Sequence, residues 1–481
     1  MNNEEERSVK LIDYFLQNPE DMKKLSVIDR RDLLRLGYVT AEKAADRRVK
    51  EKCCELLYSC CFNMELDIKE MWQIYWKLKF YLFQDALIMF SGHLDSLYRR
   101  IFLKIKSMIP DTYPPYQEGE RSNVIVIVTD QMLEIGHAPT RRVLDYAWTI
   151  NTALNKAVVI VNSAGLNYYF CRCFEGDIGF NFLEELNGIE KINYNGVTFP
   201  FMQLTEKMPD IYSMSEALDI VYNLKPELVY NIGGSSIFAD LCGMFTKTCC
   251  FPCSNDIPIT MSQYLLVGRK LSEADSERLS RLEDYQQIVE TVVNYKLPDM
   301  GQNLYNREKF GLSGADFVFG IVGNRLDTEI SDEFIELMDR LLLDLDIHIL
   351  IIGGIQNPER IKETVSFPDK IHIAGKLEDA VFAIKLLDVY LNPYRSGGGR
   401  SSFEALAQGV PVITFKYGDV YYTCGDEFAV GDDENLLETA SRYVTDGSFM
   451  ENQKHLALKR ADSLSDIAST QKEALDKILN S

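Results

Sequence analysis

The sequence predicts an α/β protein in which an N-terminal α-helical module precedes two Rossmann-like, doubly wound domains. Apolar runs rich in β-branched residues recur from residue 124 onward and end in loops that contain glycine, as buried parallel strands do. A chain of 481 residues is too long for one domain and sufficient for two α/β domains with an accessory segment. The N-terminal segment differs, because its apolar residues recur at the three- and four-residue spacing of helices.

Proline residues divide the chain. The helical pattern ends at Pro110, Pro114 and Pro115, which we interpret as a domain boundary. The strand signal fades again between residues 256 and 313. We therefore predict a helical accessory module, a first Rossmann-like domain, an interdomain connection and a second Rossmann-like domain with terminal helices, at residues 1–115, 116–260, 261–312 and 313–481.

Composition excludes several classes of function. A formal net charge of −21 argues against electrostatic binding to nucleic acid or to an anionic membrane. We expect a cytoplasmic protein without stable membrane insertion, because the sequence shows neither a secretion signal nor an apolar span of transmembrane length. Cys249, Cys250 and Cys253 come nearest to metal-ligand spacing, but no second Cys or His cluster completes the set, so we expect no metal site.

In the first domain we expect strands at residues 124–129, 158–162 and 227–232, a helix at 142–154 and a hairpin at 191–204. Ligands of open α/β sheets collect at the carboxyl ends of the strands, where the loops 130–142 and 232–237 lie. The first loop contains His137, which suits proton removal from an acceptor hydroxyl, binding of a sugar oxygen, or only the start of a helix. Gly234 and Ser235 in the second loop are either ligand contacts or a helix start.

In the second domain we expect strands at residues 317–322, 348–352, 371–374, 389–392 and 411–415, with terminal helices at 434–444 and 452–479. Asn324 and Arg325 follow the first of these strands, where a cation meets a ligand at the carboxyl edge; an ordinary loop arginine is the alternative. Lys376 and Leu377 follow the third strand.

A glycine-rich turn follows the strand expected at residues 389–392. Gly397, Gly398 and Gly399 are free to adopt backbone angles closed to other residues, so the amides of this turn are able to converge on an anion. This combination of strand, glycine turn and helix is typical of phosphate binding.

The helix expected at residues 403–408 adds charge to this turn. Ser401 and Ser402 open the helix, whose N-terminal dipole favours a diphosphate, and Arg400 supplies a full positive charge. Glu404 lies one turn into the helix, where a carboxylate is able to reach a ribose diol; otherwise it is a solvated first-turn residue.

The run from Gly397 to Ser402, followed by Glu404-Ala-Leu-Ala-Gln-Gly409-Val-Pro411, resembles the donor-binding signature of GT-B glycosyltransferases. In that family the matching carboxylate holds the ribose of a nucleotide-sugar. The retaining group carries a second glutamate eight residues earlier, where this chain has Ser396. The pattern is more similar to the inverting O-GlcNAc-transferase-like and cytoplasmic N-glycosyltransferase group.

The resemblance implies a metal-independent glycosyltransferase of the hexosyltransferase type. We expect it to move a sugar from a nucleotide diphosphate sugar, UDP-linked, to a protein or glycan acceptor in an interdomain cleft, with no cofactor beyond this co-substrate. His137 is the candidate catalytic residue, and the helical module is a candidate for oligomer formation. The expected donor-binding residues are Asn324, Arg325, Lys376, Leu377, Gly397, Gly398, Gly399, Arg400, Ser401, Ser402 and Glu404, and the candidate sugar contacts are Asp419, Gly234 and Ser235.

Two other functions stay open. Asp327 and Glu329 stand where GT-B proteins often carry a lysine after the arginine, so one expected cation is missing. Together with the missing first glutamate, this is compatible with a non-catalytic glycosyltransferase-like partner or chaperone subunit that binds a protein or glycan. A sugar-nucleotide epimerase on the same fold is a third alternative, although the loops of the first domain offer no clear second acid for it.

Overall fold

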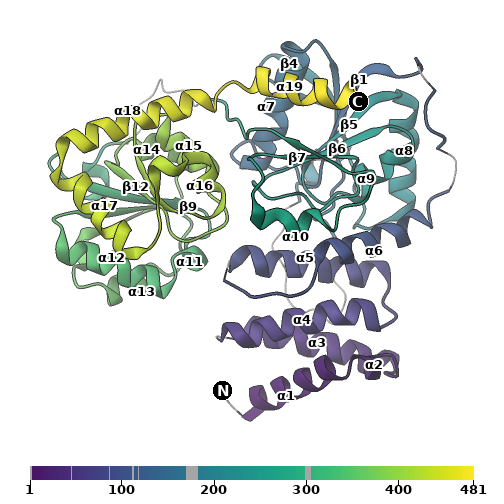
Figure 1. Cartoon of the computed structure of the whole chain (residues 1–481), viewed down its shortest axis with the longest axis horizontal. Coiled ribbons are helices and arrows are strands. Elements are labelled where there is room, and N and C mark those ends of the chain that lie inside the picture. The colour runs from purple at the N-terminus through teal and green to yellow at the C-terminus, as the bar shows by residue number, and fades with distance from the viewer. Residues whose placement is uncertain are drawn as a thin grey trace. The chain divides into compact units, whose positions relative to one another are not determined.

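The computed structural model describes residues 3–44, 46–85, 87–110, 113–117, 119–168, 182–297 and 305–481 (Figure 1). The chain divides into two compact units. The first comprises Met1–Phe83, Leu87–Thr291 and Gln471–Ser481, and the second comprises Gln84–Ala86 and Val292–Thr470. No described helix combines the length and apolar character that crossing a membrane requires.

The N-terminal region is helical, as the spacing of its apolar residues predicts. Its helices are α1 (Asn3–Gln17), α2 (Pro19–Met22), α3 (Val27–Lys43), α4 (Arg47–Asn63), α5 (Ile68–Gln84) and α6 (Leu94–Lys106). Side-chain caps start two of them: Ser26 accepts the Asp29 N–H at α3, and Asp46 accepts the Arg48 N–H at α4.

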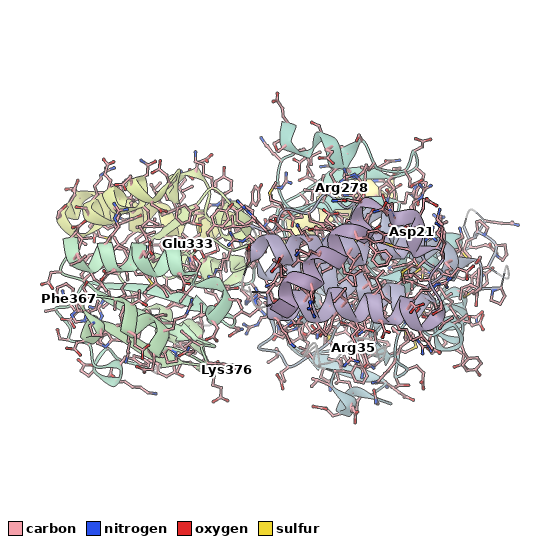
Figure 2. All side chains as sticks on the ribbon, turned by 90° about the horizontal axis from the view of Figure 1, so that it is seen from below. Asp21, Arg35, Arg278, Glu333, Phe367 and Lys376 are labelled. Atoms are coloured by element: carbon pink, nitrogen blue, oxygen red, sulfur yellow. The ribbon has the colours of Figure 1, made fainter. Side chains whose placement is uncertain are left out.

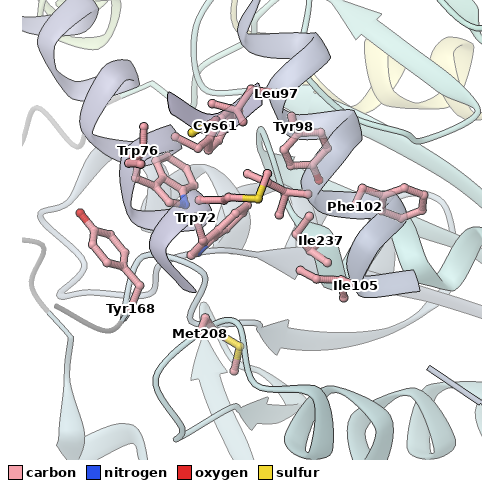
Figure 3. Packing of buried hydrophobic residues seen from close by; sticks show 14 of the residues in the cluster. Cys61, Trp72, Trp76, Leu97, Tyr98, Phe102, Ile105, Tyr168, Met208 and Ile237 are labelled. Carbon is pink, nitrogen blue, oxygen red and sulfur yellow. The ribbon is translucent and has the colours of Figure 1, made fainter. Parts of the chain in front are cut away.

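This helical region shares one hydrophobic core with the first sheet. One cluster of buried apolar residues contains members from Ile12 to Phe245, among them Trp72, Tyr98 and Ile237. Figure 3 shows the aromatic rings of α5 and α6 packed toward Ile237 and toward the loop residue Met208. The prolines near residue 110 therefore mark a change of secondary structure along the chain, while the core continues across it.

The first sheet has eight strands in the order β3-β4-β2-β1-β5-β6-β7-β8, parallel except for the β3/β4 hairpin. The strands are β1 (Ser122–Thr129), β2 (Ala157–Asn162), β3 (Lys191–Tyr194), β4 (Val197–Gln203), β5 (Pro226–Gly233), β6 (Lys247–Pro252), β7 (Tyr264–Val267) and β8 (Gln287–Glu290). The helices of this part are α7 (Ala138–Thr152), α8 (Ile211–Leu224), α9 (Ile237–Leu241) and α10 (Ser276–Leu279).

The strands β7 and β8 lie in the segment 261–312, which the sequence predicts to be an interdomain connection without strands. That prediction is wrong for these residues, because two strands of four residues each extend the sheet, and α10 is a single turn. Residues 298–304 of the expected connection lie outside the described residues.

The chain end returns to the first unit, although the sequence placed it with the second domain. The helix α19 (Ile467–Leu479) carries Gln471, whose Oε1 accepts the Tyr230 hydroxyl at 3.0 Å. Near its end, Lys247 Nζ donates to the Ile478 carbonyl at 2.9 Å. These contacts explain why Gln471–Ser481 belongs to the first unit.

The second sheet has six strands in the order β11-β10-β9-β12-β13-β14, paired in parallel. They are β9 (Val318–Gly323), β10 (His348–Gly353), β11 (Ile371–Gly375), β12 (Val389–Leu391), β13 (Val412–Phe415) and β14 (Ala429–Val430). The helices are α11 (Leu326–Glu329), α12 (Asp332–Asp344), α13 (Glu359–Thr364), α14 (Ala380–Ile384), α15 (Gly399–Leu406), α16 (Gly418–Cys424), α17 (Asp433–Thr445) and α18 (Gly447–Ser463). Two α/β units with parallel sheets confirm the predicted fold class.

Each sheet contains a point at which its strand order reverses. In the first sheet this point lies between β1 and β5, because β2 and β4 extend one side and β5 to β8 the other. In the second sheet it lies between β9 and β12. Open α/β sheets bind ligands in the crevice at such a point, outside the carboxyl ends of the strands.

Candidate functional site

The loops after β9 and β12 flank the reversal point of the second sheet, and close backbone packing holds the first of them. Gly354 N–H donates to the Gly323 carbonyl at 2.9 Å, and Leu326 N–H donates to the Gly354 carbonyl at 3.0 Å. A Cβ atom on Gly353 would overlap the Gly323 carbonyl oxygen. The loop that carries Asn324 is therefore fixed against the end of β10.

The glycine turn after β12 uses its glycines in two ways. Of Gly397, Gly398 and Gly399, only Gly398 has a left-handed backbone angle, with φ of +103°. A Cβ atom on Gly399 would lie 2.8 Å from the Tyr295 hydroxyl and 2.9 Å from Thr423 Oγ1. Close packing thus requires glycine here as much as backbone geometry does.

The helix α15 begins at Gly399, four residues earlier than the sequence predicts. Ser401 and Ser402 therefore lie inside its first turn, where their hydroxyls donate to the carbonyls of Gly398 at 3.0 Å and Gly399 at 2.9 Å. Ser402 is fully buried and its hydroxyl bonds within the helix, while donor binding by Ser402 stays a prediction. The first amides of an α-helix have no carbonyl partner within the helix, so the first amides of α15 are the groups of this turn that are able to bind an anion.

Arg400 and Glu404 pair with each other on one face of α15. Arg400 Nε lies 3.0 Å from Glu404 Oε1, and the two side chains are only 16% and 13% exposed. Glu404 is thus not a solvated surface residue. The pairing also lowers the net positive charge that Arg400 contributes at the turn. The sequence analysis did not predict this pairing.

Arg325, expected to meet the same diphosphate, is held by a carboxylate from the helix that follows it. Arg325 Nη2 lies 2.8 Å from Glu329 Oε1, and the arginine side chain remains 41% exposed. Glu329 itself is buried and pairs through its other oxygen with Arg395. Burial favours a raised pKa for Glu329, but Arg395 and Arg325 outweigh it and hold this pKa below its ordinary value.

Arg395 is a buried residue of this site that the sequence analysis does not single out. Its guanidinium donates to Asn392 Oδ1 at 2.8 Å, to the Val322 carbonyl at 2.9 Å and to the Tyr390 hydroxyl at 2.7 Å. It also lies against Gly398, where a Cβ atom would be 2.8 Å from Nη2. Arg395 therefore joins the ends of β9 and β12 beneath the glycine turn.

Tyr390 extends this network to the donor helix. Its hydroxyl lies 2.9 Å from Ser401 Oγ and so links the Arg395 guanidinium to the first turn of α15. The sequence indicates this network only weakly, through the position of Arg395 between a strand end and a glycine turn. Its partner Glu329 lies 66 residues away, so short-range pattern does not reveal the pair.

Asp419 lies beside the glycine turn, as a candidate sugar contact should. Its N–H donates to the Ser396 carbonyl at 2.8 Å, and its Cβ lies 3.2 Å from the position that a Cβ on Gly399 would take. On the same edge, the rings of Tyr394 and Tyr417 stack at 4.5 Å with an interplanar angle of 10°. The turn is thus bordered by a carboxylate and by an aromatic pair.

Lys376 and Leu377 follow the end of β11, at the far side of β10 from the glycine turn. Lys376 is exposed, and Figure 2 shows its side chain at the edge of the second unit. The structure brings Arg325 and the glycine turn together around one reversal point, while Lys376 and Leu377 stand two strands away.

His137 belongs to the first unit and occupies the N-cap position of α7. Its Nδ1 lies 2.9 Å from Thr140 Oγ1, and that oxygen also accepts the Leu133 N–H at 2.9 Å. Burial lowers the pKa of His137 to about 4, so the ring is neutral at pH 7. Its Nε2 accepts a proton only in the tautomer in which Nδ1–H donates to Thr140.

Gly234 and Ser235 lie at the end of β5, where Gly234 has φ of +128°. Ser235 is fully buried, and its hydroxyl lies 2.5 Å from the Tyr75 hydroxyl and 3.2 Å from Lys79 Nζ. The Ser235 hydroxyl therefore faces helix α5, and a sugar contact by Ser235 stays a prediction. The following serine, Ser236, caps α9, as the alternative interpretation of this segment predicts.

Among the residues that the structure describes, no three His, Cys, Asp or Glu side chains gather closely enough to hold a metal ion. Cys249 and Cys250, which come nearest to metal spacing in the sequence, are buried in β6.

Comparison with known proteins shows which family and which solved structures this chain resembles. Residues 316–446 match the protein-family model described as Glycosyl transferases group 1, and no curated protein matches the sequence. The chain is similar in structure to a mutant of the O-GlcNAc transferase of Thermobaculum terrenum, with 13% identity and a TM-score of 0.59, over 100% of this chain and 98% of that one. This similarity includes the N-terminal helical region.

Two further structures are similar over a smaller part of the chain. Sucrose-phosphate synthase of Thermosynechococcus elongatus has 13% identity and a TM-score of 0.53, over 74% of this chain and 99% of that one. HepE of Anabaena in complex with UDP has 10% identity and a TM-score of 0.53, over 74% of this chain and 100% of that one.

The fold is the GT-B fold, and it confirms the fold that the resemblance implies. The match to the Glycosyl transferases group 1 model covers residues 316–446, which contain all six strands of the second sheet.

Proposed function

We propose that this protein transfers a sugar from a nucleotide diphosphate sugar to a protein or glycan acceptor, and that the second unit binds the donor. The observation that carries the proposal is the meeting of two cation-bearing loops at the reversal point of the second sheet. One loop carries Arg325 after β9, and the other carries the glycine turn and the start of α15 after β12. A diphosphate at this point would be bound by helix amides and guanidinium groups together.

In this proposal, Arg325 and the first amides of α15 stabilise the negative charge that develops on the departing nucleotide diphosphate. Preorganised donors of this kind are effective because they need no reorganisation during the reaction. They would serve the leaving group without a metal ion. Glu404, held near the N-terminus of α15 by Arg400, would accept hydrogen bonds from the ribose hydroxyls.

We further propose UDP as the nucleotide part of the donor, with no other cofactor. Support comes from the HepE structure, which contains UDP and shares the fold of this chain. Asp419, beside the glycine turn, would bind sugar hydroxyls.

The acceptor would be oriented by the first unit, with His137 as the candidate group near its hydroxyl or amide. A ring with a pKa of about 4 is neutral at pH 7 and is a weak base. This property favours a hydrogen-bonding and orienting role for His137 over complete proton removal.

The first experiment incubates the purified protein with a panel of nucleotide-sugars and follows thermal stabilisation and slow donor hydrolysis. We expect one UDP-sugar to stabilise the protein and to be hydrolysed. A variant with Arg325→Ala and Glu404→Ala should lose both responses, because it removes a diphosphate cation and the proposed ribose ligand. The matched control is Arg340→Ala, which removes an exposed arginine of the same unit whose partner is Glu434.

Loss of both responses in the double variant but not in the control would support the proposed donor site. Equal responses in the double variant and the unmodified protein would place the donor elsewhere. Absence of any response in the unmodified protein would favour a non-catalytic partner that keeps the fold.

A further inference from the structure

Helix α5 contributes a row of side chains to the carboxyl edge of the first sheet. Trp72 Nε1 donates to the Gly165 carbonyl at 3.0 Å, just beyond the end of β2. Tyr75 and Lys79 reach Ser235, beyond the end of β5, at 2.5 and 3.2 Å. The spacing of three and four residues places the three side chains on one face of the helix, and their hydrogen bonds bring that face to this edge of the sheet.

Lys79 lies at the point where the strand order of the first sheet reverses. This point lies between β1 and β5, where Asp130 follows β1, and Gly234 and Ser235 follow Gly233 at the end of β5. A Cβ atom on Gly234 would lie only 3.9 Å from Lys79 Nζ. The second sheet has arginines and a glycine turn at its equivalent point, so the two units place a cation beside glycines at corresponding places in their topology.

The ammonium group of Lys79 is half-buried and lacks a close counter-ion. Nζ lies 4.7 Å from the centre of the Trp76 ring, and no carboxylate among the described residues forms an ion pair with it. The buried Asp130 carboxylate, whose charge acts on Lys79, accepts the Ser163 hydroxyl at 2.8 Å. A half-buried charge without a close partner is costly, and an anionic ligand would reduce that cost.

We propose that Lys79 and the turn formed by Gly233, Gly234 and Ser235 bind a carboxylate group of the acceptor. This inference rests on the proposed glycosyl transfer, since it assigns part of the acceptor to the first unit. It gives the helical region a role in the choice of acceptor, because α5 supplies the cation.

A carboxylate suits this position better than a phosphate. Lys79 is the cation whose ammonium group contacts this turn, at the Ser235 hydroxyl, and Asp130 and Asp256 lie within electrostatic reach of Nζ. Their negative charge opposes a dianion more strongly than a monoanion. An acidic side chain of a polypeptide and a uronic acid of a glycan both carry the required group.

Intrinsic fluorescence of the full-length protein provides the test. Two of its three tryptophans, Trp72 and Trp76, lie on α5 beside Lys79. The protein is titrated at constant ionic strength with N-acetylglutamate amide and with glucuronate, and with the neutral counterparts N-acetylglutamine amide and glucose. We expect a saturable change with at least one carboxylate and none with its neutral counterpart.

The variant Lys79→Met should weaken this response at least about tenfold, as expected for loss of a charge-assisted hydrogen bond, while Lys79→Arg should retain part of it. The control is Lys69→Met, which changes a lysine of the same helix. A response to the peptide probe alone would identify an acidic polypeptide as acceptor, and one to glucuronate alone an acidic glycan.

No response to either carboxylate, or one that persists in Lys79→Met, would overturn the inference. Donor hydrolysis separates this result from failure of the proposed function. Lys79 lies in the first unit, so Lys79→Met should still hydrolyse the donor. Hydrolysis without a carboxylate response rejects only the acceptor subsite, whereas absence of hydrolysis in the unmodified protein rejects the transferase.

Discussion

Glu329 Oε2 and Arg395 Nη1 lie 2.5 Å apart in an ion pair that is almost completely buried. The pair joins the helix after β9 to the strand end that precedes the glycine turn. Because Glu329 also holds Arg325 through its other oxygen, one carboxylate positions both arginines. The acidic residue that replaces an expected lysine thus has a structural role in the candidate donor site.

Substitution of Arg395 by methionine should strongly destabilise the second unit. It leaves the buried Glu329 carboxylate with Arg325 alone and removes the donors to Asn392 and Tyr390. Breaking a buried pair from one side typically costs about 3–5 kcal/mol in the free energy of unfolding. Urea denaturation followed by far-UV circular dichroism measures the effect, because Trp72, Trp76 and Trp148 all belong to the first unit and would not report it.

The control for this measurement is Arg340→Met, which breaks the exposed pair with Glu434. Exposed pairs contribute about 0–1 kcal/mol, so we expect little change. Equal destabilisation by the two substitutions would show that burial does not increase the contribution of the Arg395–Glu329 pair to the free energy of unfolding.

Much of this fold is predictable from short-range sequence pattern. The buried strands β1, β2, β9 and β10 have six to eight residues each and consist mostly of apolar residues and glycine, and such runs are recognisable alone. The strands β7 and β8 escaped prediction because each has four residues and β8 ends in charged sequence. The site shows the same division: the glycine turn is visible as a motif, whereas the Glu329–Arg395 pair depends on tertiary contact.

Substitution of Arg325 by alanine should reduce donor hydrolysis by about ten- to a hundredfold, the usual effect of losing one charge-assisted hydrogen bond. Because the Arg325 side chain is 41% exposed, we expect the free energy of unfolding to fall by less than about 1 kcal/mol. Steady-state kinetics with the identified donor, alongside urea denaturation, separate the two effects. An unchanged rate would mean that Arg325 only pairs with Glu329.

Substitution of Glu404 by glutamine should remove discrimination between ribose and deoxyribose. If the carboxylate accepts hydrogen bonds from the ribose diol, UDP should bind the unmodified protein about tenfold more tightly than 2′-deoxy-UDP. The glutamine variant should bind both with similar affinity. Calorimetric titration of the two ligands measures this difference, and a difference that persists in the variant would assign ribose recognition to another residue.

His137 should make the first unit less stable as the pH falls below neutral. Burial lowers its pKa from 6.5 to about 4, so the unfolded chain takes up a proton in this range while the folded protein does not. Stability from the neutral ring is complete above pH 6.5 and is lost toward pH 4, by up to about 3 kcal/mol. Tryptophan-monitored urea denaturation at pH 7 and pH 4.5 should show a smaller difference for His137→Gln than for the unmodified protein.

His93, which lies in the same unit as His137 and the tryptophans, provides the control for this pH effect through His93→Gln. If His137→Gln keeps the full difference between the two pH values, protonation of His137 does not limit acid stability.

Asp130 should make the first unit less stable as the pH rises, opposite to the effect of His137 and over an overlapping pH range. Burial raises its pKa from 3.8 to about 6, against the effect of the Ser163 and Ser236 hydroxyls and of Lys79. A raised carboxyl pKa gives stability that is complete below pH 3.8 and is lost as the pH rises through 6. The neutral variant Asp130→Asn retains an oxygen for the Ser163 hydroxyl, so we expect it to be more stable than the unmodified protein at pH 7, by about 1–2 kcal/mol.

Because the Asp130 and His137 effects have opposite signs, the pH dependence of the unmodified protein alone does not reveal either of them. The stability gain of Asp130→Asn should therefore be measured against the exposed control Asp256→Asn and should vanish near pH 4. A loss of stability at pH 7 would show that the ionised carboxylate is stabilised by Lys79 and the two hydroxyls more than burial opposes it. In that case the ionised Asp130 would be the counter-ion of Lys79. Neutralising it, as in Asp130→Asn, should then raise the affinity of the proposed acceptor subsite for a carboxylate.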